Sequence, residues 1–120
     1  MAVTWAVTIN SQFHQSVGSE TVVDATIVGT GTYTTGGDVL TAAALGLDVI
    51  DFISGNVDGN GANTNGAALP AWNLGSGPGA TSVTIMLFGG AASSGATFAQ
   101  LGSSTTVTGL TFRIRAYGVA

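Results

Sequence analysis

The sequence predicts a mainly β protein: a single-domain β-sandwich or jelly-roll-like barrel over residues 1–120, with one short helical turn near residues 41–46. Three observations favour this fold class. Short β-branched segments recur along the chain, glycine-rich turns separate them, and only one run has helix-forming character. A chain of 120 residues buries roughly two thirds of its unfolded surface, so we expect one domain with its own core.

Several segments have the composition or the alternation of strands. Apolar and polar side chains that alternate along a segment are typical of a strand with one buried face. The clearest case is the last segment, where Phe112 and Ile114 alternate with Arg113 and Arg115. The pattern predicts seven or eight strands, among them residues 3–9, 20–28, 49–53, 82–88 and 110–117, with residues 32–35 as a further short candidate.

The helical turn is predicted from residues that favour the beginning and the end of a helix. The Thr41 hydroxyl is placed to accept an amide hydrogen of the first turn, and residues 42–45 favour helix. Gly46 stands where a left-handed residue ends a helix, and Leu47 then folds back as its apolar contact. We expect three leucines of this stretch to fill one end of the core, namely Leu40, Leu45 and Leu47.

Residues 55–79 are rich in glycine and asparagine and are predicted to form two exposed loops around a short apolar piece. That piece contains Trp72, which we interpret as the best contact anchor because tryptophan dominates protein interfaces. Trp5 and Tyr117 are also expected to be partly exposed, and Phe13 is expected to anchor the polar segment around it.

Charge is the most unusual property of the chain. Only 7% of the residues are charged, against about 25% in an ordinary domain, and none is a lysine. A surface of small polar residues costs little to desolvate, which favours a protein that stays in contact with other proteins. The net charge of −4 argues against nucleic acid as a partner, and no apolar run of 18 residues predicts a membrane helix. The amino-terminal residues do not resemble a signal peptide.

No pattern of residues predicts an enzyme, a metal site or a cofactor site. Asp48 and Asp51 would point to opposite faces of a strand, and His14 is the only histidine. The loop that begins at Asp58 offers oxygen atoms but lacks the further carboxylates of a calcium loop, so an exposed loop is the favoured interpretation. The chain has no cysteine.

Arg113 and Arg115 are the only cations, and they share one face of the last predicted strand. Two like charges at this spacing imply partners. Two interpretations stay open: ion pairs within the chain, with Asp48 or Asp51 as the acid, or a contact with a neighbouring subunit.

Two stretches resemble a known family. They are GGDVLTAAALGL at residues 36–47 followed by VIDF at residues 49–52, and LTFRIRAYG at residues 110–118. Together they resemble the capsid decoration (cement) proteins of tailed bacteriophages, and the resemblance covers roughly residues 33–55 and 104–118. It implies a β-rich protein without enzymatic chemistry, often a trimer at the three-fold positions of a capsid.

The resulting hypothesis is a virion structural protein on the capsid surface, assembled in the host cytoplasm. It would bind across neighbouring major capsid proteins and stabilise the head, as a homo-oligomer with the trimer favoured. The predicted contact residues are Trp5, Phe13, Trp72, Arg113, Arg115 and Tyr117. The alternative is a glycan-binding or adhesin-type β domain of a phage tail or fibre, with Trp72 or Trp5 stacked on a sugar ring.

Overall fold

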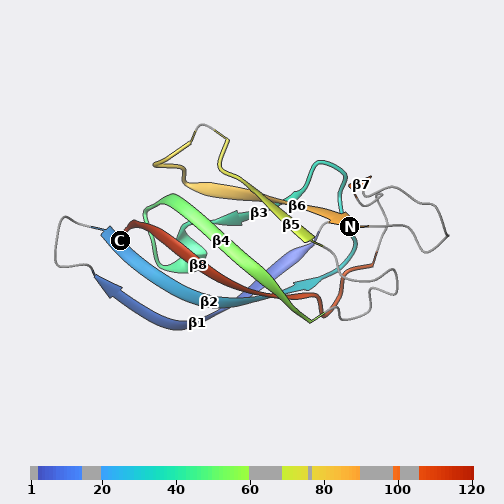
Figure 1. The fold of residues 1–120 in the computed structure, drawn as a ribbon, viewed down its shortest axis with the longest axis horizontal. Coiled ribbons are helices and arrows are strands. Elements are labelled where there is room, and N and C mark those ends of the chain that lie inside the picture. Colours follow the sequence, from blue (N-terminus) through green and yellow to red (C-terminus); the bar gives the residue numbers. More distant parts are fainter. Residues whose placement is uncertain (1–2, 15–19, 60–68, 76, 90–98, 101–105) are drawn as a thin grey trace.

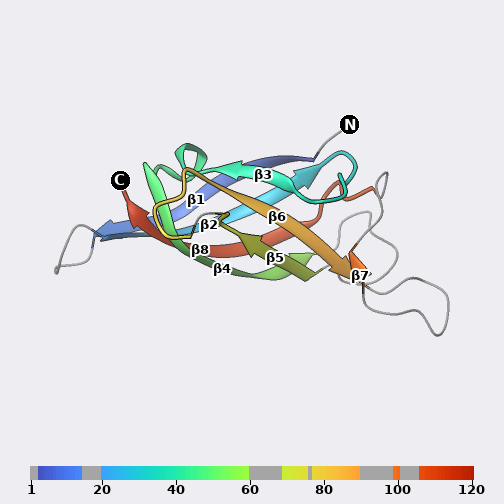
Figure 2. The ribbon, with the colours of Figure 1, turned by 90° about the horizontal axis from the view of Figure 1, so that it is seen from above.

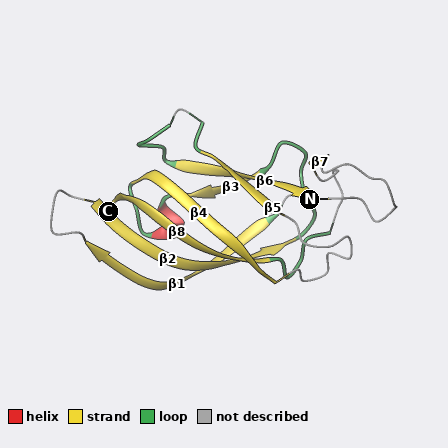
Figure 3. Ribbon diagram, viewed as in Figure 1, coloured by secondary structure: helices red, strands yellow, loops and turns green. Residues whose placement is uncertain are grey.

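The protein is built of eight strands and one short 3-10 turn in the part of the chain that the structure describes (Figure 3). The computed structural model describes residues 3–14, 20–59, 69–75, 77–89, 99–100 and 106–120, and for residues 11–14 and 99–100 it describes the backbone alone. The strands form two antiparallel sheets, which confirms the prediction of a mainly β protein.

The first sheet has four long strands and is called the long sheet. Its order is β1-β2-β8-β4, and every neighbouring pair is antiparallel. The strands have 9 to 11 residues each, so the ladder of backbone hydrogen bonds is long. Their bounds are Thr4–His14 (β1), Glu20–Thr30 (β2), Thr111–Val119 (β8) and Val49–Gly59 (β4).

The second sheet, the short sheet, has the order β3-β6-β5, and the brief strand β7 also pairs with β6. Its strands are Asp38–Thr41 (β3), Ser82–Gly89 (β6), Leu69–Asn73 (β5) and Ala99–Gln100 (β7). The two sheets form facing layers (Figures 1 and 2). No ladder joins them into one closed sheet among the described residues, so the predicted barrel alternative is wrong.

One apolar core lies between the two layers. Alternate residues of β6, including Ile85 and Leu87, and of β8, including Phe112 and Ile114, are buried. At the centre, the Phe112 ring lies 5.8 Å from the Trp5 ring and 5.9 Å from the Trp72 ring, centroid to centroid. Aromatic pairs at such distances stabilise a core beyond the area that they bury.

The predicted helical turn is present as the 3-10 turn η1, Ala43–Leu45. The Thr41 hydroxyl accepts a hydrogen bond from the Ala44 amide at 3.3 Å, although Ala42 is the residue at the N-cap position. Gly46 ends the turn at φ 75°, in the left-handed region that favours glycine. Leu40, Leu45 and Leu47 are all buried in the core, as predicted.

Several boundaries differ from the prediction, and β1 in particular continues to His14. The strand expected at residues 32–35 is instead β3 at residues 38–41, because the turn at Gly36 and Gly37 comes before it. Residues 55–59, predicted to be loop, extend β4. The apolar piece around Trp72 is the strand β5, with Pro70 on an edge strand where a missing amide is tolerated.

A tyrosine completes the short sheet beyond the point where β3 begins. The first residue of β3, Asp38, lies opposite Ile85, so the strand does not reach Leu87. The buried Tyr33 hydroxyl accepts a hydrogen bond from the Leu87 amide at 3.1 Å and satisfies it in place of a backbone carbonyl. Burial raises the pKa of Tyr33, which therefore remains a neutral phenol.

Candidate interaction surfaces

The outer side of the short sheet, which we call the short-sheet face, combines apolar and small polar side chains and has no charged residue among those that the structure describes. Val39 and Leu69 are its most exposed apolar residues, at 56% and 49% of their full exposure. Strand pairing places Leu69 opposite Phe88 and Ala71 opposite Met86. The nine described residues of the face are Val39, Thr41, Leu69, Ala71, Asn73, Ser82, Thr84, Met86 and Phe88.

The only charged residue of β3, β5 and β6 is Asp38, which is buried and accepts a hydrogen bond from the Thr34 amide at 3.2 Å. The described part of the face therefore offers methyl, thioether and aromatic groups with a few hydroxyl and amide groups among them. Depletion of charge is typical of the centre of a protein interface. An exposed apolar patch on a protein marks a site of contact with another molecule.

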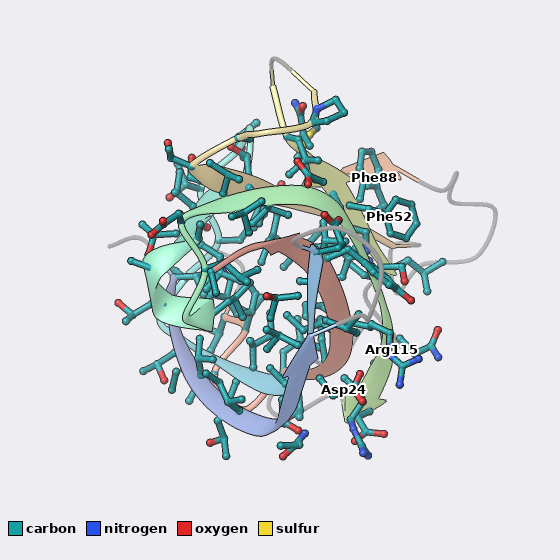
Figure 4. All side chains as sticks on the ribbon, turned by 90° about the vertical axis from the view of Figure 1, so that its left-hand side faces the viewer. Asp24, Phe52, Phe88 and Arg115 are labelled. Atoms are coloured by element: carbon teal, nitrogen blue, oxygen red, sulfur yellow. The ribbon has the colours of Figure 1, made fainter. Side chains whose placement is uncertain are left out.

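The outer side of the long sheet, the long-sheet face, has both cations of the chain. Arg115 lies between Asp24 and Ser54 in the strand register. Its Nε donates to Asp24 Oδ1 at 2.6 Å and its Nη2 donates to Oδ2 at 2.9 Å, a bidentate ion pair (Figure 4). The Asp24 carboxylate also raises the pKa of Arg115 above its usual value, so the guanidinium keeps its charge.

Arg113 lies one row further along the same face, between Thr26 and Asn56. Its side chain is exposed, and no carboxylate pairs with it among the described residues. The two arginines border a shallow depression of about 440 Å³. The depression is lined by Asp24, Ser54, Gly55, Asn56, Arg113, Ile114 and Arg115.

An aromatic row lies at the other side of the Asp24–Arg115 pair. Phe52, which is 56% exposed, tilts against Tyr117 with ring centroids 5.8 Å apart. Tyr117 lies opposite Val22, and the backbone of Phe13 lies opposite Val22 on its other side. The long-sheet face therefore combines an aromatic row, a fixed ion pair and an unpaired arginine in successive rows.

Two carboxylates lie close together at the end of the long-sheet face. The pKa of Glu20 is raised, first by loss of water and then by the neighbouring Asp51 carboxylate. Asp51 lies in the bulge that shifts the register between Ile50 and Phe52. The predicted pairing of the arginines with Asp48 or Asp51 is wrong for Arg115, whose partner is Asp24.

Trp5 lies in the core, and Trp72 lies in a strand with its ring packed against the core, not in the predicted surface loop. Trp5 is 8% exposed, so its predicted partial exposure is wrong. Trp72 points inward from β5 and is half-buried, with its ring edge against Phe112. This packing depends on Gly55, where a Cβ atom would lie 3.0 Å from the Trp72 ring and 2.7 Å from the Arg113 carbonyl oxygen. A missing side chain in β4 thus makes room for the ring.

The predicted contact residues therefore divide into two groups. Arg113, Arg115 and Tyr117 come together on the long-sheet face with Phe52, whereas Trp5 and Trp72 do not reach it. The backbone of Phe13 is aligned with this face, and its side chain lies outside the described residues. The predicted loop at residues 60–63 lies outside them as well.

Sequence reasoning missed Phe52, Asp24 and the whole short-sheet face. The local sequence carries little signal for this face, because Leu69, Pro70, Ala71 and Trp72 form a continuous apolar run without alternation of apolar and polar residues.

No group of three His, Cys, Asp or Glu side chains within the described ranges is placed to hold a metal ion. The same part of the chain contains no helix long and apolar enough to cross a membrane. Comparison of the chain with protein-family models, with curated proteins and with solved structures finds no match.

Proposed function

We propose that the protein is a non-enzymatic virion structural protein, a capsid decoration protein that binds across neighbouring major capsid proteins and stabilises the head. The observation that supports this proposal most is the short-sheet face, which exposes Val39 and Leu69 and has no charged residue in its described part. In this proposal the two layers are a β-sandwich with jelly-roll-like character, and the sandwich serves as a rigid spacer between two contact surfaces.

Two outer surfaces on opposite layers suit a protein that bridges neighbours. The short-sheet face and the long-sheet face point in opposite directions because the two sheets share one core between them. A bridging protein needs contacts on more than one side, and each contact can then be modest in strength. In a trimer three such protomers would bind together, and the combined avidity would exceed that of a single protomer.

The short-sheet face suits contact with protein for a physical reason. Removing Val39, Leu69 and their neighbours from water gains roughly 25 cal/mol for each Å² of apolar area. With no ion to strip of its water, little of this gain is lost to desolvation. Such a surface favours an extended apolar partner over a charged or highly hydrated one.

The test uses particles purified from the virus that encodes the chain. We expect the protein to be present in intact particles, and Leu69→Glu to reduce its binding to particles that lack it, because a buried unpaired carboxylate is costly. The matched control is Thr34→Glu, which adds the same charge at an exposed turn residue outside the short-sheet face. Absence of the protein from purified particles would exclude the proposal.

The alternative, a glycan-binding or adhesin-type domain of a phage tail or fibre, has one supporting observation. Phe52 exposes an aromatic ring beside the polar depression, and a sugar ring can stack on such a ring while Asn56 and Ser54 supply hydrogen bonds. Trp5 is buried and Trp72 is half-buried against Phe112, so Phe52 offers the more accessible ring. Binding to a glycan array that is lost in Phe52→Ala would favour this alternative.

A further inference from the structure

We propose that the depression on the long-sheet face is a carboxylate-binding site, in which Arg113 binds an acidic side chain of a protein partner. The inference rests on the proposed function in one respect, since it assumes that the partner is a protein. It adds the chemistry by which the second of the two outer surfaces recognises that partner.

The first step concerns the distribution of charge. The chain has two cations in 120 residues, and both border this one depression. Arg115 is neutralised by a bidentate ion pair with Asp24, with donor–acceptor distances of 2.6 and 2.9 Å. Arg113 is left with a full positive charge and no carboxylate partner among the described residues. The depression therefore has a net charge of about +1 on a protein of net charge −4.

The second step concerns hydrogen bonds. An arginine offers donors in a planar fork that matches the two oxygens of a carboxylate. Asn56 lies directly opposite Arg113 in the strand register, and Ser54 lies opposite Arg115. Their amide and hydroxyl groups line the depression beside the guanidinium and can donate to the same ligand.

The Asp24–Arg115 pair helps to position the site. Because two hydrogen bonds join Arg115 to Asp24, its guanidinium is directed to that carboxylate within the lining of the depression. Asp24 lines the depression as well, and its charge is balanced by Arg115. Arg113 is thus the cation that a ligand meets without first breaking an ion pair.

The third step concerns the class of ligand. A phosphate group has close to two negative charges at neutral pH, whereas one unpaired guanidinium balances a single charge. A carboxylate matches that charge. Phe52, exposed beside Tyr117, adds apolar contact area near the polar depression. An aspartate or glutamate on a partly apolar protein surface fits both features.

Binding can be tested on the full chain without any particle. A hexaglutamate peptide is titrated into the ¹⁵N-labelled protein, with a hexaglutamine peptide as the uncharged probe. We expect saturable shifts of the Arg113 Nε–H and Asn56 Nδ2 signals with hexaglutamate alone. The shifts should fall away as the pH drops through about 4.3, where glutamate side chains protonate, and they should weaken at high salt.

Two variants separate the role of the fork from that of charge. Arg113→Gln should weaken hexaglutamate binding by about tenfold or more, the loss expected for a charge-assisted hydrogen bond. Arg113→Lys keeps the charge but not the planar fork. It should bind hexaglutamate more weakly than the parent and more strongly than Arg113→Gln. Thr34→Glu gives the same net charge as Arg113→Gln and should bind nearly as well as the parent.

Equal NMR signal shifts with hexaglutamine, or undiminished hexaglutamate binding by a folded Arg113→Gln variant, would contradict the proposed carboxylate-binding site. Stronger shifts of the same signals with inorganic phosphate would overturn the assignment to a carboxylate. The peptide titration is independent of the particle experiment. Carboxylate binding without particle association would contradict only the proposed function. Particle association that Arg113→Gln leaves unchanged would contradict only the role of this site in binding to the particle.

Discussion

The two outer faces of the molecule differ in chemistry although they are built by the same alternation of residues. The short-sheet face belongs to strands of 4, 5 and 8 residues and has no charged residue in its described part. The long-sheet face belongs to strands of 9 to 11 residues and has both arginines, an ion pair and a pair of neighbouring carboxylates.

The difference shows how each sheet is held in place. The long sheet has an extended ladder of backbone hydrogen bonds, so its outer residues are free to vary towards polar chemistry. The short sheet has a shorter ladder and needs side-chain support, from the leucines around η1 at one place and from Tyr33 at another. The largest effects of substitution are therefore expected at those supports, and the smallest on the outer faces.

The largest effect is expected for Leu45→Ala. Leu45 is fully buried at the turn η1, which contacts β1 of the long sheet and β3 of the short sheet. Removing its side chain leaves a cavity that should cost about 2–5 kcal/mol of unfolding free energy. Chemical denaturation measures this loss. Because η1 touches both sheets, hydrogen exchange should rise in both together.

Leu69→Ala is the control for this substitution, since it removes the same atoms from a half-exposed position on the short-sheet face. We expect Leu69→Ala to lower the free energy of unfolding much less than Leu45→Ala does. If the Leu45→Ala variant lost protection only in β3 and β6, the two sheets would be independent units and η1 would not couple them.

An intermediate effect is expected for Tyr33→Phe. Without the hydroxyl, the buried Leu87 amide has lost the acceptor that Tyr33 supplies, and an unsatisfied buried donor costs about 1–3 kcal/mol. Tyr117→Phe removes the same hydroxyl group from the long-sheet face, where water can replace it, and should change stability by about 0.5 kcal/mol at most. Equal losses for the two variants would show that the short sheet does not depend on Tyr33.

Much of the fold follows from local patterns in the sequence. The alternation in residues 82–88 and 110–117 predicts β6 and β8, and the glycine stop at Gly46 predicts the end of η1. These features depend on neighbours within a few residues. The strand β5 was not predicted, because its five residues include Pro70 and lie between glycine-rich segments that resemble loops.

The candidate surfaces were less predictable because they depend on register between distant segments. Asp24 and Arg115 are 91 residues apart, and only the pairing of β2 with β8 brings them together. Trp72 is half-buried because Gly55, 17 positions before it, leaves room for its ring, a fact that no local pattern contains. The glycine-rich neighbours favour an exposed loop around Trp72, and tertiary packing decides otherwise.

The smallest effect is expected for Glu20→Gln at the end of the long-sheet face. The pKa of Glu20 is raised in the folded protein, by loss of water and by the adjacent Asp51 carboxylate. The folded state therefore binds this proton more tightly than the unfolded state, so the ionised side chain opposes folding at neutral pH, and this opposition disappears as the pH falls through the raised value. Glu20→Gln should raise the melting temperature slightly at pH 7, and the difference should vanish in acid.

Asp48→Asn, which removes one charge at an exposed position nearby, is the control for net charge. A melting temperature of Glu20→Gln below that of the parent at pH 7 would show that the pair stabilises the long sheet, so that polar chemistry on this face would support the fold instead of being tolerated by it.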